Sequence, residues 1–143
     1  MSTRTFAVLL GGILLLGAAL GFVPALLVPS ADIHPLSVDT PHDQLFGLFP
    51  VNAGDNILHA VLGLWGLFWS RGARTAARYL RLMTGILILL TLLGFVPALS
   101  NLLPLYGNDI WLHALFALPT AYFGWVHRSA PDAVLSRPDG TVR

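Results

Sequence analysis

The chain of 143 residues contains no cysteine, no lysine and no glutamate, and charged residues make up only 10% of it. The absence of cysteine excludes disulfides, thiol nucleophiles, thiolate metal sites and haem attached through a Cys-x-x-Cys-His motif. Arginine and aspartate supply the charged side chains, and the formal net charge is +1. This near balance gives no reason to expect a nucleic acid or an acidic substrate as a partner.

Apolar residues make up 55% of the chain and charged residues only 10%. A soluble domain carries about a quarter charged residues, so the excess of apolar residues is expected to face lipid. Because a helix needs about 20 apolar residues to cross a bilayer, we expect four crossings. The second is short and spans only if the polar turn from Asp55 lies among the headgroups. The four stretches are Phe6–Leu27, Ile57–Ser70, Leu82–Leu99 and Ile110–Val126. The sequence thus predicts an all-α fold, a four-transmembrane-helix bundle, as a single membrane domain (residues 1–143) that ends in a polar cytoplasmic tail (128–143).

The arginines predict the orientation of these helices. All eight fall on one side of the four-span arrangement, and the central group comprises Arg71, Arg74, Arg78 and Arg81. We interpret this stretch, 71–81, as a polar loop. The positive-inside rule then places both termini and this loop in the cytoplasm, with the protein in a bacterial inner membrane and the lipid bilayer as its main partner.

Two motifs occur twice, in the same order. Residues 21–26 read Gly-Phe-Val-Pro-Ala-Leu and return unchanged at 94–99, and an Asp-x-x-x-His-Ala segment occurs at 55–60 and 109–114. We expect two tandem helical hairpins, with repeat one at about 6–70 and repeat two at about 82–127. Since each repeat crosses the membrane twice, both enter it in the same direction, related by a pseudo-two-fold axis along the membrane normal. The first stretch could alternatively be a cleaved signal peptide, but its repeated ending favours a helix.

The paired Asp and His residues are the candidate site. The spacing places Asp55 with His59, and Asp109 with His113, on one helix face near the outer surface. In one interpretation each Asp caps its helix and bonds its His. In a second, the pairs converge on a divalent metal ion; in a third, the two histidines hold a haem.

Small residues indicate where helices approach each other closely. We predict helix-packing roles for Gly17, Gly21, Gly63 and Gly66. The five residues from Leu45 to Phe49 are expected to lie along the interface before the second helix. The sequence holds no catalytic motif that we recognise, so an enzyme is unsupported and no catalytic residue or resident cofactor is expected.

The outer segment from Leu45 to Asn52, the Asp55–His59 motif, and the later Leu103–Leu105 and Asn108–His113 segments resemble one family. It is a family of small bacterial four-helix integral membrane proteins catalogued as domain of unknown function 4383. The chain departs from the pattern by carrying Asn108-Asp109 where Asp-Asn is expected, and Pro119 within the fourth stretch. The resemblance implies four transmembrane helices and supplies no activity. We therefore expect a non-catalytic accessory or structural subunit with a membrane-protein partner or a second copy of itself. The alternative is a metal- or haem-binding membrane protein.

Overall fold

The computed structural model of the chain describes residues 1–29, 41–96 and 103–127. The elements in chain order are α1 (Thr3–Leu20), the 3-10 turn η1 (Pro24–Leu26), β1 (Leu27–Pro29), β2 (Asp43–Leu45), β3 (Phe49–Val51), α2 (Ala53–Trp69), α3 (Ala73–Gly94), α4 (Asn108–Ala121) and the π-helical turn η4 (Tyr122–Val126). The prediction of a mostly helical chain with four helices is confirmed. The predicted tail at 128–143 and part of the second Gly-Phe-Val-Pro-Ala-Leu copy lie outside the described residues.

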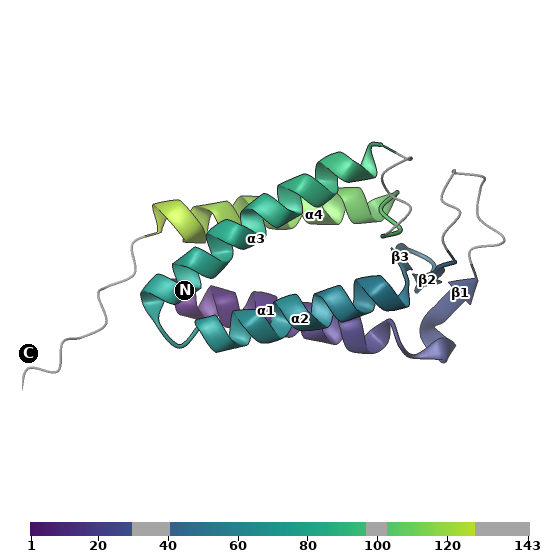
Figure 1. The fold of residues 1–143 in the computed structure, drawn as a ribbon, viewed down its shortest axis with the longest axis horizontal. Helices are drawn as coiled ribbons and strands as arrows, with labels where there is room; N and C mark the ends of the chain where they lie inside the picture. Colours follow the sequence, from purple (N-terminus) through teal and green to yellow (C-terminus); the bar gives the residue numbers. More distant parts are fainter. Residues whose placement is uncertain (30–40, 97–102, 128–143) are drawn as a thin grey trace, which may run out of the picture.

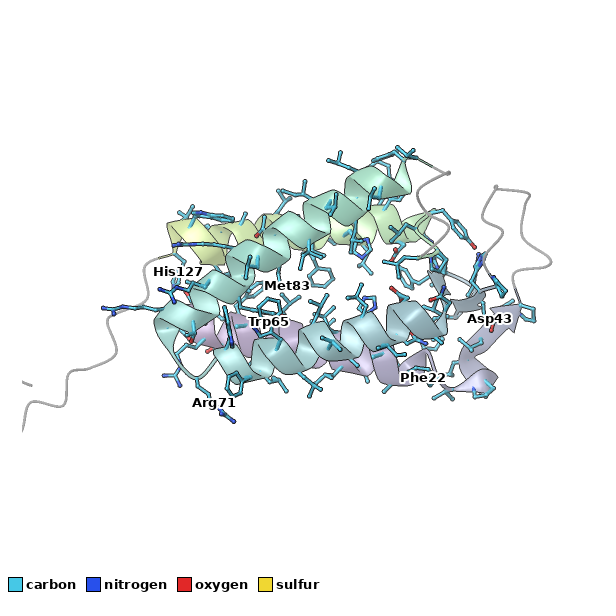
Figure 2. All side chains as sticks on the ribbon, in the orientation of Figure 1. Phe22, Asp43, Trp65, Arg71, Met83 and His127 are labelled. Carbon is cyan, nitrogen blue, oxygen red and sulfur yellow. The ribbon has the colours of Figure 1, made fainter. Side chains whose placement is uncertain are left out.

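The four helices are arranged as two pairs that lie side by side. α1 packs along α2, the first helix pair, and α3 packs along α4, the second helix pair (Figure 1). α1 and α3 run away from the end that holds the N-terminus, and α2 and α4 return to it. The two pairs lie close together at this end and diverge toward the small sheet at the other end. We call these the arginine end, after Arg71, and the sheet end; Figure 2 shows Arg71 at one and Asp43 at the other.

The packed core lies between the pairs, nearer the arginine end. Tyr79, Leu80 and Met83 of α3 are almost completely buried, against Ala7 and Leu10 of α1. The hydroxyl of Tyr79 donates a hydrogen bond of 3.1 Å to the carbonyl oxygen of Leu62 in α2. α3 therefore contacts both helices of the first pair, and Phe6 of α1 also stacks on Phe123 of η4.

Two helices, α1 and α3, are long and apolar enough to cross a membrane. Only 33% of each apolar window is buried within the protein. A core helix of a soluble protein of this hydropathy would be mostly buried, because exposed apolar surface is costly in water. The exposed faces of α1 and α3 are thus suited to lipid.

Two helix boundaries differ from the sequence predictions. α3 begins at Ala73, inside the arginine-rich stretch that we had interpreted as a loop, so Arg74, Arg78 and Arg81 are helical. Alanine and arginine are good helix formers, and no proline interrupts the stretch. α1 ends at Leu20, before the first repeated motif, because Pro24 cannot continue a helix.

The structure also contains a small sheet that the all-α prediction missed. β1, β2 and β3 form an antiparallel sheet in that order, with Val28 opposite Gln44 and Gln44 opposite Pro50. The segment from Leu45 to Phe49, expected to lie along the interface, comprises the last residue of β2, the turn at 46–48 and the first residue of β3. Phe46 and Gly47 there both have positive φ. Strands of three residues give too short a pattern to be recognised in an apolar sequence.

Candidate functional site

The first Asp–His pair lies at the start of α2, at the sheet end. The N-cap is Asn52, whose side chain accepts a hydrogen bond of 2.8 Å from the backbone N–H of Asp55. Asp55 is therefore not the cap that we expected, but its carboxylate lies in the first turn, where the helix dipole favours negative charge. Nδ1 of His59 lies 3.0 Å from the carbonyl oxygen of Asp55 and 3.2 Å from its carboxylate. His59 is thus held by its own helix.

The second pair lies at the start of α4 and is more deeply buried. The helix follows Gly107, whose φ of 62° is unfavourable for other residues, and it has no side-chain cap. Nδ1 of His113 is 3.5 Å from the carboxylate of Asp109. This contact falls short of a hydrogen bond, and the buried Nδ1 has no hydrogen-bond partner among the described residues. The two pairs therefore share a spacing, but Nδ1 of His59 has a hydrogen-bond partner and Nδ1 of His113 does not.

The fold brings the two pairs near each other. Asp55 and His59 border one cavity together with His113 and a second cavity together with Asp109. Within the described residues, no three Asp or His side chains are close enough together to hold a metal ion. We call Asp55, His59, Asp109 and His113 the Asp–His cluster, because together they border these two cavities. The metal or haem site expected there stays a prediction.

The repeated motifs meet each other within each helix pair. A Cβ on Gly21 would collide with the side chain of Asn56, and one on Gly94 would lie 2.5 Å from Ile110. Asn56 and Ile110 each follow the Asp of their own motif. In both halves a glycine at the end of one helix therefore makes room for the first turn of the next, which gives the two motifs a common packing role.

The other predicted packing glycines have different surroundings. A Cβ on Gly63 would lie 2.8 Å from the carbonyl oxygen of Gly11, and one on Gly66 would lie 2.6 Å from the hydroxyl of Tyr79. Gly17 makes no such approach: no atom lies within 4 Å of a Cβ built there. It borders a cavity between the helix pairs instead.

The arginines of the described chain lie at the opposite end from the Asp–His cluster. The side chain of Arg4 donates a hydrogen bond of 3.0 Å to the carbonyl oxygen of Ser70, and that of Arg81 one of 2.6 Å to the carbonyl oxygen of Gly124. Both acceptors are near helix C-termini, where positive charge is favourable. Arg71, Arg74 and Arg78 are exposed.

Two polar residues of this region were missed by the sequence analysis. Asn56 is buried, and its side-chain amide donates a hydrogen bond of 2.8 Å to the carbonyl oxygen of Gly21. The hydroxyl of Tyr106 and Nε2 of His42 are 2.6 Å apart and share a hydrogen bond. This bond connects the segment that leads into β2 to the segment before α4. The position of Asn56 directly after Asp55 was the available signal. Nothing in the sequence pairs His42 with Tyr106.

The chain belongs to the family described as Domain of unknown function (DUF4383), whose model matches residues 4–126. No curated protein and no solved structure matches the chain. The resemblance noted in the sequence is therefore confirmed at the level of the family.

Proposed function

We propose that this member of the family is a non-catalytic integral membrane protein that acts as an accessory or structural subunit of a larger membrane assembly. Its four helices would cross the bilayer as a bundle. The observation that carries the proposal is the exposure of large apolar side chains on all four helices: Leu9, Ile13 and Leu16; Val61, Leu64 and Phe68; Leu82, Ile88 and Leu89; Trp111, Leu115 and Leu118. A surface of this kind is stable against lipid or another apolar protein surface.

The two shorter helices are also compatible with crossing. α2 has 17 residues, and the 14 residues of α4 continue directly into the five residues of η4. A span needs about 20 residues, with a lower limit near 17. Trp111 and Trp125 lie near the two ends of the α4–η4 segment and are exposed, as expected for aromatic side chains at the two membrane interfaces.

The charges support the orientation of the proposed bundle. Arg71 lies at one end and Asp43 at the other (Figure 2). Asp55 and Asp109 are in the first turns of α2 and α4, the helices that start at the sheet end (Figure 1). By the positive-inside rule, the arginine end would face the cytoplasm of a bacterial cell.

Matching hydrogen bonds support a parallel repeat of two hairpins. The backbone N–H of Val23 bonds to the carbonyl oxygen of Leu20, and that of Val96 bonds to that of Leu93. These residues occupy equivalent places in the two copies of the motif. Together with the glycine contacts described above, they support two structurally equivalent halves.

Outward-facing glycines offer places where a partner helix could approach. Gly12 on α1 and Gly85 on α3 are exposed, and no atom lies within 4 Å of a Cβ built on either. Small residues at such positions allow close contact between membrane helices.

The same two glycines allow a direct test. A photoreactive amino acid is placed at Gly12 or Gly85, and native membranes are irradiated and solubilised in a mild detergent. We expect a discrete protein adduct from at least one position, identified by mass spectrometry, and co-purification of the same protein with the unmodified tagged chain. Adducts with lipid alone, together with recovery of a lone monomer, would contradict the accessory role.

The second candidate function is the metal- or haem-binding role, for which the Asp–His cluster would have to draw closer together, since no three of its side chains are near enough to hold an ion in the described residues. A divalent ion or a haem would use Asp55, His59, Asp109 and His113. This proposal predicts stoichiometric metal or a Soret band in the purified protein, lost in the His59→Ala, His113→Ala double mutant. A folded, colourless and metal-free preparation would exclude it.

A further inference from the structure

A cavity separates the two helix pairs where they diverge. It encloses about 130 Å³ and is lined by side chains of all four helices, among them Leu14, Leu58, Met83 and Phe116. An apolar cavity of about 150 Å³ is known to remain dry and to bind benzene. The space is therefore large enough for a ring or for a short stretch of an alkyl chain.

The cavity has a polar end. Asp55, His59 and His113 belong to its wall. A second cavity, of about 190 Å³, lies beneath the β2–β3 turn and is bordered by Asp55, His59 and Asp109. Because Asp55 and His59 border both spaces, the Asp–His cluster lies between the cavity that separates the helix pairs and the second cavity at the sheet end.

One nitrogen of the cluster lacks a hydrogen bond, although the Asp109 carboxylate lies 3.5 Å from it. His113 is 5% exposed, it borders the apolar cavity, and its Nδ1 has no hydrogen-bond partner among the described residues. A buried polar atom without a partner is unfavourable, so native proteins satisfy nearly all of them with protein, water or ligand. His59 differs, since Asp55 already bonds its Nδ1. His113 is thus the group that a ligand would satisfy.

The charge of the cluster selects the ligand. Two acidic side chains, Asp55 and Asp109, border the second cavity, and Asp55 also borders the first. The arginines of the described chain lie at the other end of the molecule, so none of them could neutralise a carboxylate or phosphate head here. A cationic head that donates hydrogen bonds could pair with these acidic side chains and bond to an imidazole nitrogen.

We infer that this cavity binds a single-chain amphiphile with an ammonium head, which lies at the Asp–His cluster while the first few carbons of its alkyl chain occupy the space between the helix pairs and the rest of the chain extends out of the cavity. Gly17 keeps this space open, because it borders both chambers and no atom lies within 4 Å of a Cβ built on it. The inference does not depend on the accessory role, since it concerns the inside of the protein and not its outer faces.

The test uses three probes that share a 12-carbon chain: dodecylamine, dodecanol and dodecanoic acid. The full chain is placed in phosphatidylcholine nanodiscs, and bound radiolabelled probe is measured above the amount held by empty discs. We expect about one equivalent of dodecylamine per chain, weaker binding of dodecanol, and no specific binding of dodecanoic acid.

Two glycine variants provide the matched comparison. Gly17→Leu fills the cavity and is expected to weaken dodecylamine binding at least tenfold. Gly12→Leu adds the same side chain to the same helix, facing outward, and is expected to leave binding unchanged. If Gly17→Leu does not fold, the smaller Gly17→Ala has room in the structure and should still weaken binding measurably.

His113→Phe tests the head. It keeps an aromatic ring but removes the unpartnered nitrogen, and we expect it to reduce the preference for dodecylamine over dodecanol. Equal binding of amine and acid, or binding unaffected by both the Gly17 and His113 substitutions, would mean partition into lipid only and would overturn the inference. Either result leaves the cross-linking test of the accessory role unaffected.

Discussion

The closest approach between α1 and α2 gives a quantitative prediction. A Cβ on Gly11 would lie 2.8 Å from the carbonyl oxygen of Gly63 and 3.3 Å from the backbone nitrogen of Leu67. Both are backbone atoms, so no side chain can rotate away. Ordinary contact begins at 3.4 Å, and Gly11→Ala must therefore separate the two helices by a few tenths of an ångström.

The cost of this separation can be estimated. Overpacking of a tight contact costs about 1–3 kcal/mol, and a gap of about 0.5–1 Å removes a quarter to a half of each neighbouring dispersion contact. Replacing a helical glycine by alanine returns up to about 1 kcal/mol through helix propensity. We therefore expect Gly11→Ala to lower the free energy of unfolding by up to about 2 kcal/mol, and to be about 1–3 kcal/mol less stable than a variant that gains only helix propensity.

Gly12→Ala is the control. It lies on the same helix, one residue further along, and no atom lies within 4 Å of its new Cβ. Only the propensity term applies, so this variant should be as stable as the wild type or up to about 1 kcal/mol more stable. Stability is measured by unfolding in mixed detergent–SDS micelles, followed by tryptophan fluorescence. Equal stability of the two variants would refute the predicted α1–α2 contact.

Three further predictions concern buried hydrogen bonds and orientation. Asn56→Ala leaves the carbonyl oxygen of Gly21 without its donor and should cost about 1–3 kcal/mol in the same unfolding assay; an unchanged midpoint would exclude a role for this bond. Tyr79→Phe removes only the hydroxyl and should cost about 0.5–1.5 kcal/mol, and a larger loss would point to altered packing. Because the chain has no cysteine, single-cysteine variants can report orientation: a membrane-impermeant maleimide added outside should label Leu48→Cys and not Arg74→Cys. Labelling of the second variant alone would reverse the topology.

The sequence was sufficient for features that depend on local composition and periodicity. Apolar stretches predicted four helices and the approximate position of each along the chain. These properties follow from the backbone of each segment and need no knowledge of its neighbours. The loop predicted at 71–81 is wrong from Ala73 onward, because a high arginine content does not oppose a helix.

Only the tertiary structure could show what the repeated motifs contact. The sequence placed Asp55 and Asp109 in equivalent positions, but it could not show that Asn52 is the cap, that His59 is bonded while Nδ1 of His113 is not, or that Gly17 borders a cavity. These facts depend on how far apart the two helix pairs lie, and that separation is set by side chains distant in the sequence. The sequence alone therefore determined which residues are equivalent, and packing between the pairs decided how their environments differ.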